Sequence, residues 1–398
     1  MFTSQARRSC TNTIVLVVLV VVCFYFGLQL SSSTLRTILW SSPERMPSYH
    51  NYTSSFSFDL DKSTRPDWMG RVPDQTSLAS LSIPGTHDTE TFDLVHKTVY
   101  QCQNHDLKTQ LRAGLRYFDI RGRQVIDEAA GGEDAAPVIG IFHAQVYTGY
   151  TLEDVLLTLF EFLDQHPTEG IIMRLKQEGP PVRRKPEGTF DDDEEEEEKE
   201  EEAGTTAYKT TFEEAFNHYR LKNPRTEPGS TKHLLVPWPS PSAPAGAPLL
   251  PTMSTLRGRV LVLQEFPSAP GVSYGVPWES PHISLEDLWI IVDLEHLEEK
   301  WRAIRASLEA AAASPAGSDV LFLSHLSASV GVTPIEAAGG PLEAVNGSMI
   351  EGMNDRTGRL LEKSVRDGQQ GKTGVIMGDF PGQRLVDAIL ARNAWLTG

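Results

Sequence analysis

Residues 82–89 read Ser82-Ile83-Pro84-Gly85-Thr86-His87-Asp88-Thr89, and this stretch decides how the rest of the chain is interpreted. It completes an apolar run that begins at Leu78 and breaks at a Pro-Gly pair. A histidine and a carboxylate follow directly. An apolar strand, a sharp turn and then titratable side chains are typical of a strand that ends at the rim of an active site.

The same order of features recurs along the chain, with helical patterns between the apolar runs. Strands are predicted at Leu78–Ile83, Leu115–Ile120, Val138–Phe142, Gly170–Leu175, Arg259–Leu263, Ile290–Val292, Asp319–Leu323 and Gly374–Met377. Helices are predicted at Thr151–Gln165, Tyr208–Tyr219, Glu295–Ala312, Pro341–Val365 and Gln383–Trp395. This alternation favours an α/β fold, a distorted TIM-type (β/α) barrel of parallel strands. An open doubly wound sheet is the alternative, although no glycine-rich dinucleotide loop follows the first strand.

The residues before this pattern are predicted to form two segments. Ile14–Leu30 is almost entirely apolar and would span about 26 Å as a helix, the short end of a membrane span. Residues 1–30 are therefore predicted to be a cytosolic tail with an uncleaved type II anchor, or alternatively a cleaved signal segment. Residues 31–74 are rich in Ser, Thr and Pro and are predicted to be a stalk. Either interpretation places the barrel, residues 75–398, in a lumen or outside the cell.

Two glycosylation sequons, at Asn51 and Asn346, agree with that placement. Cys102 is the only cysteine of the predicted barrel, so no disulfide framework is expected there. The barrel must then be stabilised by its apolar core.

Two insertions interrupt the barrel pattern. Residues 183–206 form an acidic insertion that is predicted to be disordered, and residues 236–252 form a Pro-rich linker. Residues 191–202 hold eleven acidic residues and one lysine, which is ten of the seventeen net negative charges of the chain. This balance excludes a nucleic-acid-binding protein and disfavours docking on an anionic leaflet through a basic patch.

Charged side chains stand just after several of the predicted strands. They are His87 with Asp88, Arg121, His143, Lys176 and Asp379. In a barrel of parallel strands they lie on one face. Two histidines suit a reaction that removes one proton and donates another, and an arginine suits a phosphate. Together these residues predict phosphodiester cleavage by general acid–base catalysis.

At these motifs the chain resembles the X domain of phosphatidylinositol-specific phospholipase C, chiefly the small bacterial-type enzymes and their fungal relatives. The likeness covers roughly residues 75–398 and is strongest over 78–178. It implies a metal-independent, lyase-type reaction that releases diacylglycerol and a cyclic inositol phosphate from an inositol phospholipid. It also implies His87 as general base, His143 as general acid, Asp88 as an aide to His143, Arg121 as the residue that neutralises the phosphate, and Asp379 as the residue that holds His87.

The resemblance implies substrate contacts as well. Lys176 matches a lysine that contacts the ring or the phosphate, and Trp289 stands where an aromatic residue stacks on the ring. Asp287 is expected to accept hydrogen bonds from inositol hydroxyls. Glu265 stands where an arginine is expected, and it would repel a phosphorylated ring. Phosphatidylinositol or a glycosylated inositol lipid at a membrane surface is therefore the expected partner of a monomeric protein.

No cofactor or metal is expected, because Arg121 can supply the positive charge that calcium supplies in metal-dependent relatives. A weak calcium site at Asp119 and Glu178 is the alternative. Two other functions stay open: a metal-dependent glycerophosphodiester-type phosphodiesterase, and an inactive, membrane-anchored barrel with a binding role. A separation of more than about 10 Å between His87 and His143 would favour the inactive barrel. His325, after the seventh strand, has no assigned role and is the first of the remaining histidines to re-examine.

Overall fold

The computed structural model describes residues 52–127, 136–184, 190, 210–240, 242, 244, 246–315, 317–344 and 347–396. They belong to one compact unit, Tyr49–Gly398. The predicted tail, the apolar segment 14–30, both sequon asparagines and most of the acidic insertion lie outside the described residues. Within the described ranges, no helix combines the length and apolar character needed to cross a membrane.

Eight parallel strands form one curved sheet in the order β8-β7-β5-β2-β1-β15-β11-β9. Their bounds are β1 Ser82–Thr86, β2 Tyr117–Asp127, β5 Gly170–Gln177, β7 Arg259–Glu265, β8 Val276–Pro277, β9 Ile283–Glu286, β11 Leu321–His325 and β15 Gly374–Gly378. The predicted distorted α/β barrel is therefore confirmed. Among the described residues no pairing joins β8 to β9, so the ring of hydrogen bonds stays open there.

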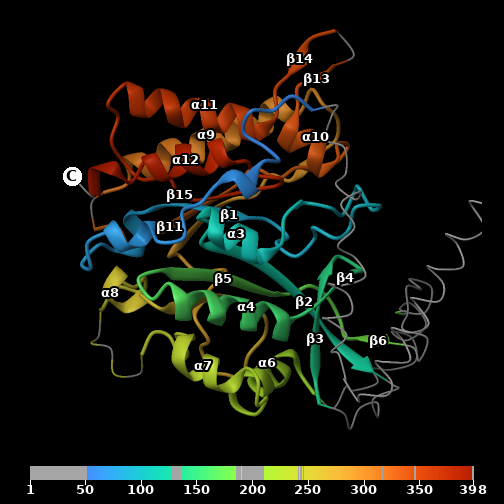
Figure 1. Ribbon diagram of the computed structural model, residues 1–398, viewed down its shortest axis with the longest axis vertical. Helices are drawn as coiled ribbons and strands as arrows, with labels where there is room; N and C mark the ends of the chain where they lie inside the picture. Colours follow the sequence, from blue (N-terminus) through green and yellow to red (C-terminus); the bar gives the residue numbers. More distant parts are fainter. Residues whose placement is uncertain are drawn as a thin grey trace, which may run out of the picture. The chain divides into compact units, whose positions relative to one another are not determined.

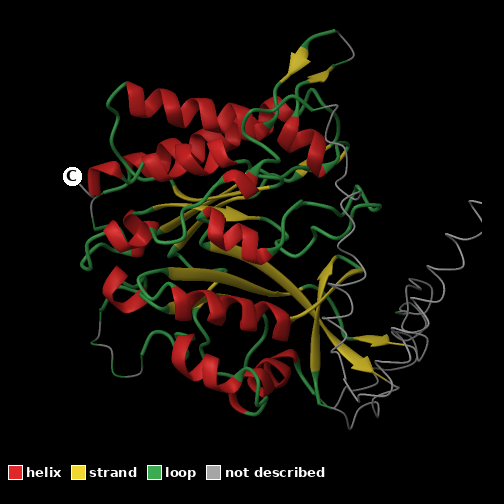
Figure 2. Ribbon diagram, viewed as in Figure 1, coloured by secondary structure: helices red, strands yellow, loops and turns green. Residues whose placement is uncertain are grey.

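Helices flank the sheet in two groups (Figures 1 and 2). One group is α4 Leu152–Gln165, α6 Phe212–Leu221 and α7 Glu227–His233, on the side of β5 and β7. The other is α9 Leu297–Ala313, α11 Met353–Arg366 and α12 Gln383–Ala391, on the side of β11 and β15. Shorter helices are α3 Leu107–Ala113, α8 Met253–Leu256, α10 Pro334–Gly339, and the 3-10 turns η1 Leu60–Lys62, η2 Trp68–Arg71, η3 Leu78–Ser80 and η6 Ala394–Leu396.

The strands bury both faces, as parallel barrel strands do. Leu261 and Leu263 of β7 belong to the inner core, whereas Val260 and Val262 belong to the core under the helices. The helical period predicted for 151–165 is confirmed by the buried residues of α4, which are Leu152, Val155, Leu156, Leu159, Phe160 and Leu163. Thr151 and Asp154 form a capping box that begins this helix.

Two of the predicted strands take a different place in the fold. β3 Val138–His143 runs antiparallel to β2 and continues into the hairpin strand β4 Val146–Thr151. Only a short connection separates β2 from β3, and a parallel crossover needs about a dozen residues or more. Ile290–Val292 is not a barrel strand, because β10 Ile290–Ile291 pairs with β12 Ser329–Val330 in a separate two-stranded sheet.

Four other boundaries also differ from prediction. The helix predicted at Pro341–Val365 begins only at Met353, after the short strands β13 Leu342–Glu343 and β14 Met349–Ile350. The first strand begins at Ser82, because Leu78–Ser80 is a 3-10 turn. The predicted stalk does not extend to residue 74, because Phe56, Leu60 and Met69 are at most 1% exposed and pack into the barrel cores. The acidic insertion also begins later than predicted, since Val182–Arg184 form β6, which pairs with β2.

Candidate active site

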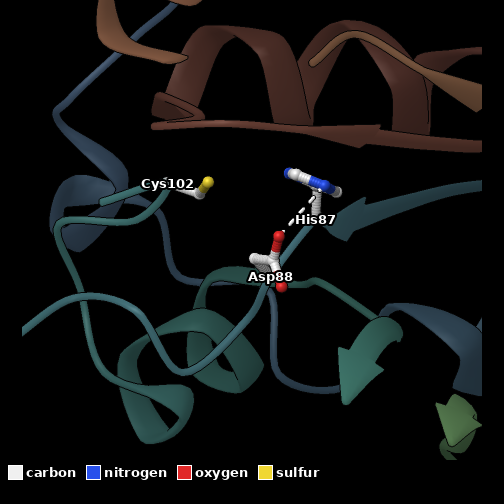
Figure 3. Close-up of side chains that lie close together, drawn as sticks. All are labelled: His87, Asp88 and Cys102. Carbon is white, nitrogen blue, oxygen red and sulfur yellow. Dashed lines mark ion pairs between the residues drawn. The ribbon is translucent and has the colours of Figure 1, made fainter. Parts of the chain in front are cut away.

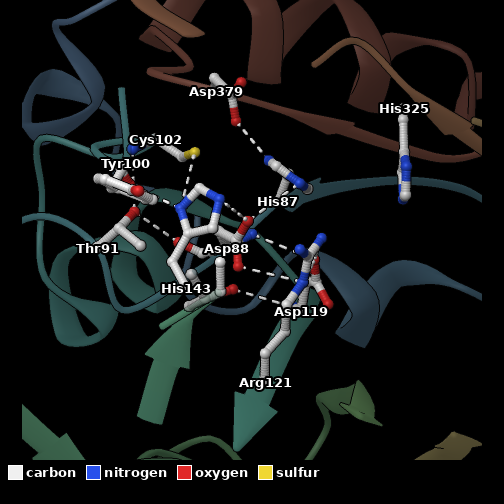
Figure 4. Close-up of polar contacts among 12 residues, drawn as sticks. His87, Asp88, Thr91, Tyr100, Cys102, Asp119, Arg121, His143, His325 and Asp379 are labelled. Atoms are coloured by element: carbon white, nitrogen blue, oxygen red, sulfur yellow. Dashed lines mark hydrogen bonds and ion pairs between the residues drawn. The ribbon is translucent and has the colours of Figure 1, made fainter. Parts of the chain in front are cut away.

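Sheet register brings His87 and Asp379 together although 292 positions separate them. Thr86 of β1 pairs with Gly378 of β15, so the next residue of each strand leaves the sheet side by side. His87 Nδ1 lies 2.9 Å from Asp379 Oδ1 (Figure 4). The contact follows from the parallel pairing of the first and last strands of the barrel.

His143 reaches the same place from the β3–β4 hairpin. Its Nδ1 lies 2.8 Å from the carbonyl oxygen of Tyr100, and a carbonyl can only accept, so Nδ1 carries the hydrogen. The ring centroids of His87 and His143 are 6.3 Å apart, with the ring planes at 82°. This separation is well below the distance that would favour an inactive barrel.

Asp88 lies between the two imidazole rings (Figure 4). Its Oδ2 is 3.1 Å from His87 Nε2 and 3.4 Å from His143 Nε2. Its Oδ1 is 3.1 Å from Arg121 Nε, and the side chain is 2% exposed. One buried carboxylate therefore contacts both histidines and the arginine.

The backbone turns sharply directly after three of the site residues. Asp88, Ala144 and Phe380 follow the two histidines and Asp379, and their φ angles are 41°, 50° and 44°. This left-handed region is uncommon for residues other than glycine, and such residues cluster at functional sites where their surroundings hold them in place. The turns aim the preceding side chains toward one another at the strand ends.

Arg121 is surrounded by carboxylates. Its Nη2 lies 2.8 Å from Asp119 Oδ2, and its Nη1 lies 3.7 Å from Glu178 Oε1. Glu178 also pairs with Lys176, at 2.7 Å. The register explains this group, because Asp119 and Arg121 of β2 stand beside Arg174 and Lys176 of β5, respectively.

Burial sets the charge states of these groups. Desolvation, with a smaller contribution from the Arg121 charge, lowers the pKa of His87 well below its usual value. Desolvation also raises the pKa of Asp88 and raises that of Asp379 well above its usual range. Burial would raise the pKa of Asp119 too, but Arg121 and Arg174 hold it well below its usual value. The resting site therefore favours a neutral His87 and an ionised Asp119 beneath the arginines.

Glu265 does not face the site as an unpaired carboxylate. Arg174 Nε lies 2.6 Å from Glu265 Oε2, and Arg174 Nη1 lies 3.2 Å from Asp119 Oδ1. The Arg174 guanidinium also lies 4.0 Å from the ring centroid of Trp278. Sequence reasoning missed Arg174 and Trp278. The signal for Arg174 was its spacing, since a residue two positions before Lys176 shares its face of the strand.

Asp287 and Trp289 lie differently from what was expected. Asp287 Oδ1 is 2.6 Å from His325 Nδ1, and the ring of His325 lies 5.7 Å from that of His87. The Trp289 side chain is 46% exposed, and no ring contact with the site histidines is found among the described residues. The structure therefore brings Asp287 to the site through His325.

A cation would find a poor set of ligands here. His87, Asp88 and Cys102 have ligand atoms within 4.8 Å of one another (Figure 3). Burial raises the pKa of the Cys102 thiol well above its usual value, so the thiolate that binds metals is disfavoured. Asp119 and Glu178, the alternative calcium ligands, are paired with Arg121. Arg121 thus lies beside both alternative calcium ligands, and burial favours the neutral form of the Cys102 thiol.

Known proteins similar to this chain include bacterial enzymes of one kind. The 1-phosphatidylinositol phosphodiesterase of Listeria monocytogenes is 26% identical over 341 residues, which cover 83% of this chain and 86% of that protein. The Staphylococcus aureus protein of the same name is 28% identical over 177 residues, 44% of this chain and 46% of that protein. The human PI-PLC X domain-containing protein 1 is 28% identical over 151 residues, 30% of this chain and 45% of that protein. No family model matches the chain.

Solved structures give the same fold. The phosphatidylinositol-specific phospholipase C from Listeria monocytogenes superposes with a TM-score of 0.54 at 24% identity, covering 83% of this chain and 99% of that one. A Staphylococcus aureus phosphatidylinositol-specific phospholipase C superposes with a TM-score of 0.55 at 19% identity, covering 84% and 99%. The similarity therefore extends over the barrel as a whole.

Proposed function

We propose that this chain, a relative of the bacterial phosphatidylinositol-specific phospholipases C, cleaves the phosphodiester bond of an inositol phospholipid. The observation that carries the proposal is the position of Asp88, whose one carboxylate contacts the Nε2 atoms of two histidines and the guanidinium of Arg121. Two imidazoles and a fixed cation at this distance suit one phosphate group.

His87 acts as the general base. Its low pKa keeps it neutral near pH 7, so it can accept the proton of the inositol 2-hydroxyl. The hydroxyl oxygen then bonds to the neighbouring phosphorus, which makes the attack intramolecular and removes much of its entropic cost. The hydrogen bond to Asp379 holds the His87 ring in position for this transfer.

His143 acts as the general acid. Its Nδ1–H is held by the Tyr100 carbonyl, so the proton that it donates is the one on Nε2. That proton goes to the oxygen of the departing diacylglycerol as the phosphorus–oxygen bond breaks, which leaves a cyclic inositol phosphate. Asp88 Oδ2, 3.4 Å from Nε2, helps to position that proton before the transfer.

Arg121 neutralises charge on the phosphate in the transition state, usually the largest catalytic effect. Its Nη1 makes only a 3.7 Å contact with Glu178, which leaves this donor the most available for a phosphate oxygen. Lys176, 28% exposed at the adjacent position of β5, adds a second positive charge. We propose that no metal takes part, because Arg121 supplies the charge that a cation would bring.

The lipid substrate is phosphatidylinositol or a glycosylated inositol lipid. Arg174 pairs with Glu265 in this structure, so Glu265 does not confront the ring as a bare negative charge. The Arg174–Glu265 pair, with the guanidinium of Arg174 lying over the Trp278 ring, instead offers polar atoms to the ring hydroxyls. The proposal that a monomeric, glycosylated barrel acts in a lumen or outside the cell, either anchored or secreted, rests on the apolar segment 14–30 and the two sequons.

Incubation with vesicles that contain phosphatidylinositol tests the proposal. We expect a cyclic inositol phosphate product in the presence of EDTA. His87→Ala and His143→Ala should each lower turnover by about 10²–10⁴-fold, the usual effect of losing a general acid or base. His296→Ala, in the exposed pair with Asp293, is the matched control and should keep wild-type turnover.

Near-normal activity of either site variant would contradict the assignment. Loss of activity in EDTA with rescue by calcium would contradict the metal-free mechanism and favour a metal-dependent phosphodiesterase. Binding of the vesicles without any product would instead favour an inactive barrel with a binding role.

A further inference from the structure

His325 is a buried histidine with one nitrogen left unpaired. It ends β11, its side chain is 1% exposed, and its Nδ1 lies 2.6 Å from Asp287 Oδ1. Its Nε2 is buried and has no hydrogen-bond partner among the described residues. A buried polar atom without a partner costs free energy, so its presence indicates a group that binds there.

The supports of His325 are rigid. Ser324 pairs with Glu286 in the register of β11 and β9, so the next residues, His325 and Asp287, emerge together. The end of β9 is fixed by the buried ion pair of Glu286 with Lys300, at 3.0 Å. His325 thus occupies a fixed position at the carboxyl edge, as His87 and Asp379 do.

The hydrogen bond to Asp287 determines which nitrogen of His325 can accept. Burial would raise the pKa of Asp287, but the bond to His325 and the histidine charge hold it below its usual value, so Asp287 stays a carboxylate. A carboxylate accepts, so His325 donates through Nδ1–H, and in the neutral ring Nε2 presents a lone pair. His325 is therefore set up as a hydrogen-bond acceptor.

The position of His325 suits a polyol. The centroid of its ring lies 5.7 Å from that of His87, the residue proposed to take the proton of the 2-hydroxyl; Figure 4 labels both side chains. This proximity places both imidazoles at the same part of the site, where hydroxyls of one inositol ring could contact each of them. Arg174, another buried polar side chain at this edge, already donates to Asp119 and Glu265.

We propose that His325 is a specificity-determining residue of the head-group site, and that its Nε2 accepts a hydrogen bond from one ring hydroxyl of the inositol. Asp287 is then a positioning residue that holds the tautomer of His325. The proposal rests on the proposed function, since it assigns a substrate contact within that site.

The test uses water-soluble aryl esters of myo-inositol 1-phosphate, intact or with one ring hydroxyl replaced by hydrogen. We expect wild-type protein to lose about 10-fold or more in kcat/KM on one deoxy ester. The kcat/KM of His325→Phe on the intact ester should fall by a similar factor. On that deoxy ester, its kcat/KM should be close to that of wild type. His325→Gln, which keeps a polar atom at the site, should recover part of the activity.

His282→Phe is the matched control. His282 pairs with Asp319 at the opposite ends of the same two strands, β9 and β11. It should keep the wild-type preference among the deoxy esters. If His325→Phe does not fold, nitrogen NMR of the wild-type protein replaces it: the Nε2 resonance of His325 should shift on addition of myo-inositol, and that of His282 should not.

The outcomes separate the two proposals. If wild-type protein cleaves none of the esters, the proposed function fails. If wild-type protein cleaves the intact ester and His325→Phe shows the same deoxy profile and the same kcat/KM as wild type, the role of His325 is refuted and the function stands. An equal loss on every ester would likewise refute a hydroxyl contact.

Discussion

Individual side chains decide the charge of this site. Burial has the largest effect on the pKa of His87 and lowers it, and the nearby Arg121, His143 and His325 act in the same direction. A histidine base must be neutral to accept a proton. The lowered pKa of His87 thus extends the pH range in which the base is ready.

This environment gives a pH prediction. Protonation of His87 removes the base, and a lowered pKa delays protonation to more acidic conditions. We therefore expect the acidic limb of kcat/KM to lie below about pH 6.5, the ordinary histidine value. In an NMR titration His87 should likewise have its midpoint below that value, while His296, whose pKa is raised by its hydrogen bond to Asp293, should have its midpoint above it. A His87 midpoint at or above that of His296 would contradict the prediction.

The sequence predicted which side chains lie together where a titratable residue follows a strand directly. His87, His143 and Arg121 are placed together as expected. The pairing of Arg174 with Glu265 and of His325 with Asp287 could not be predicted, because each pair depends on the register between separate segments. Knowledge of which strands are neighbours was needed, and one sequence does not contain it.

Strand pairing places the base. Gly85 of β1 stands opposite Tyr117 of β2 in the register, two positions before His87. A Cβ atom on Gly85 would lie 2.7 Å from Tyr117 Cβ and 2.8 Å from its carbonyl oxygen. Real Cβ atoms do not approach so closely, and Tyr117 is fully buried, so the strands would have to move apart.

Gly85→Ala should therefore lower both stability and activity. We expect a loss of about 1–3 kcal/mol in the free energy of unfolding, the usual cost of overpacking. Turnover should fall as well, because the displaced strand carries His87 away from Asp88. Urea unfolding and the vesicle assay measure the two effects. Gly70→Ala is the control, since the nearest contact of its Cβ would be the Thr168 hydroxyl at 3.2 Å, and unchanged behaviour of Gly85→Ala would disprove this account.

The periodicity of apolar residues predicted helices that bury one face. It did not predict whether a strand runs parallel or antiparallel to its neighbour. The helix at 151–165 carries its apolar residues on one side and is confirmed. The antiparallel direction of β3 was missed, because an apolar run reads the same in either direction. Ile290 and Val292 look like core but are 52% and 59% exposed, so apolar composition alone misplaced that strand.

The two edges of the whole barrel serve different purposes. At the carboxyl edge, buried charges converge on the two histidines. At the opposite edge, Arg116 and Glu169 form a fully buried pair at 2.8 Å just before β2 and β5. Glu169 also accepts from the backbone amides of Met69 and Gly70, which ties the N-terminal segment to the barrel. The charged residues at the carboxyl edge therefore form the candidate active site, whereas the buried Arg116–Glu169 pair at the opposite edge stabilises the fold.

Glu169→Gln should lower stability without lowering catalytic efficiency. Breaking a buried pair leaves an uncompensated arginine, so we expect a loss of about 3–5 kcal/mol in the free energy of unfolding. The kcat/KM of the folded fraction should stay within about twofold of wild type, because the pair is remote from the histidines. Glu161→Gln, which removes the exposed pair with Lys108, should cost less than about 1 kcal/mol. A tenfold fall in kcat/KM of folded Glu169→Gln would contradict this division.

The pairing of the first barrel strand with the last also bears on biosynthesis. A ribosome makes about 5–20 residues per second, so the 292 positions between His87 and Asp379 take roughly 15–60 s to translate. Throughout that interval the base has no partner and β1 lacks one of its two neighbours. A nascent chain therefore cannot form the contact between His87 and Asp379 until β15 has left the ribosome, and the two halves of the candidate site come together only at that point.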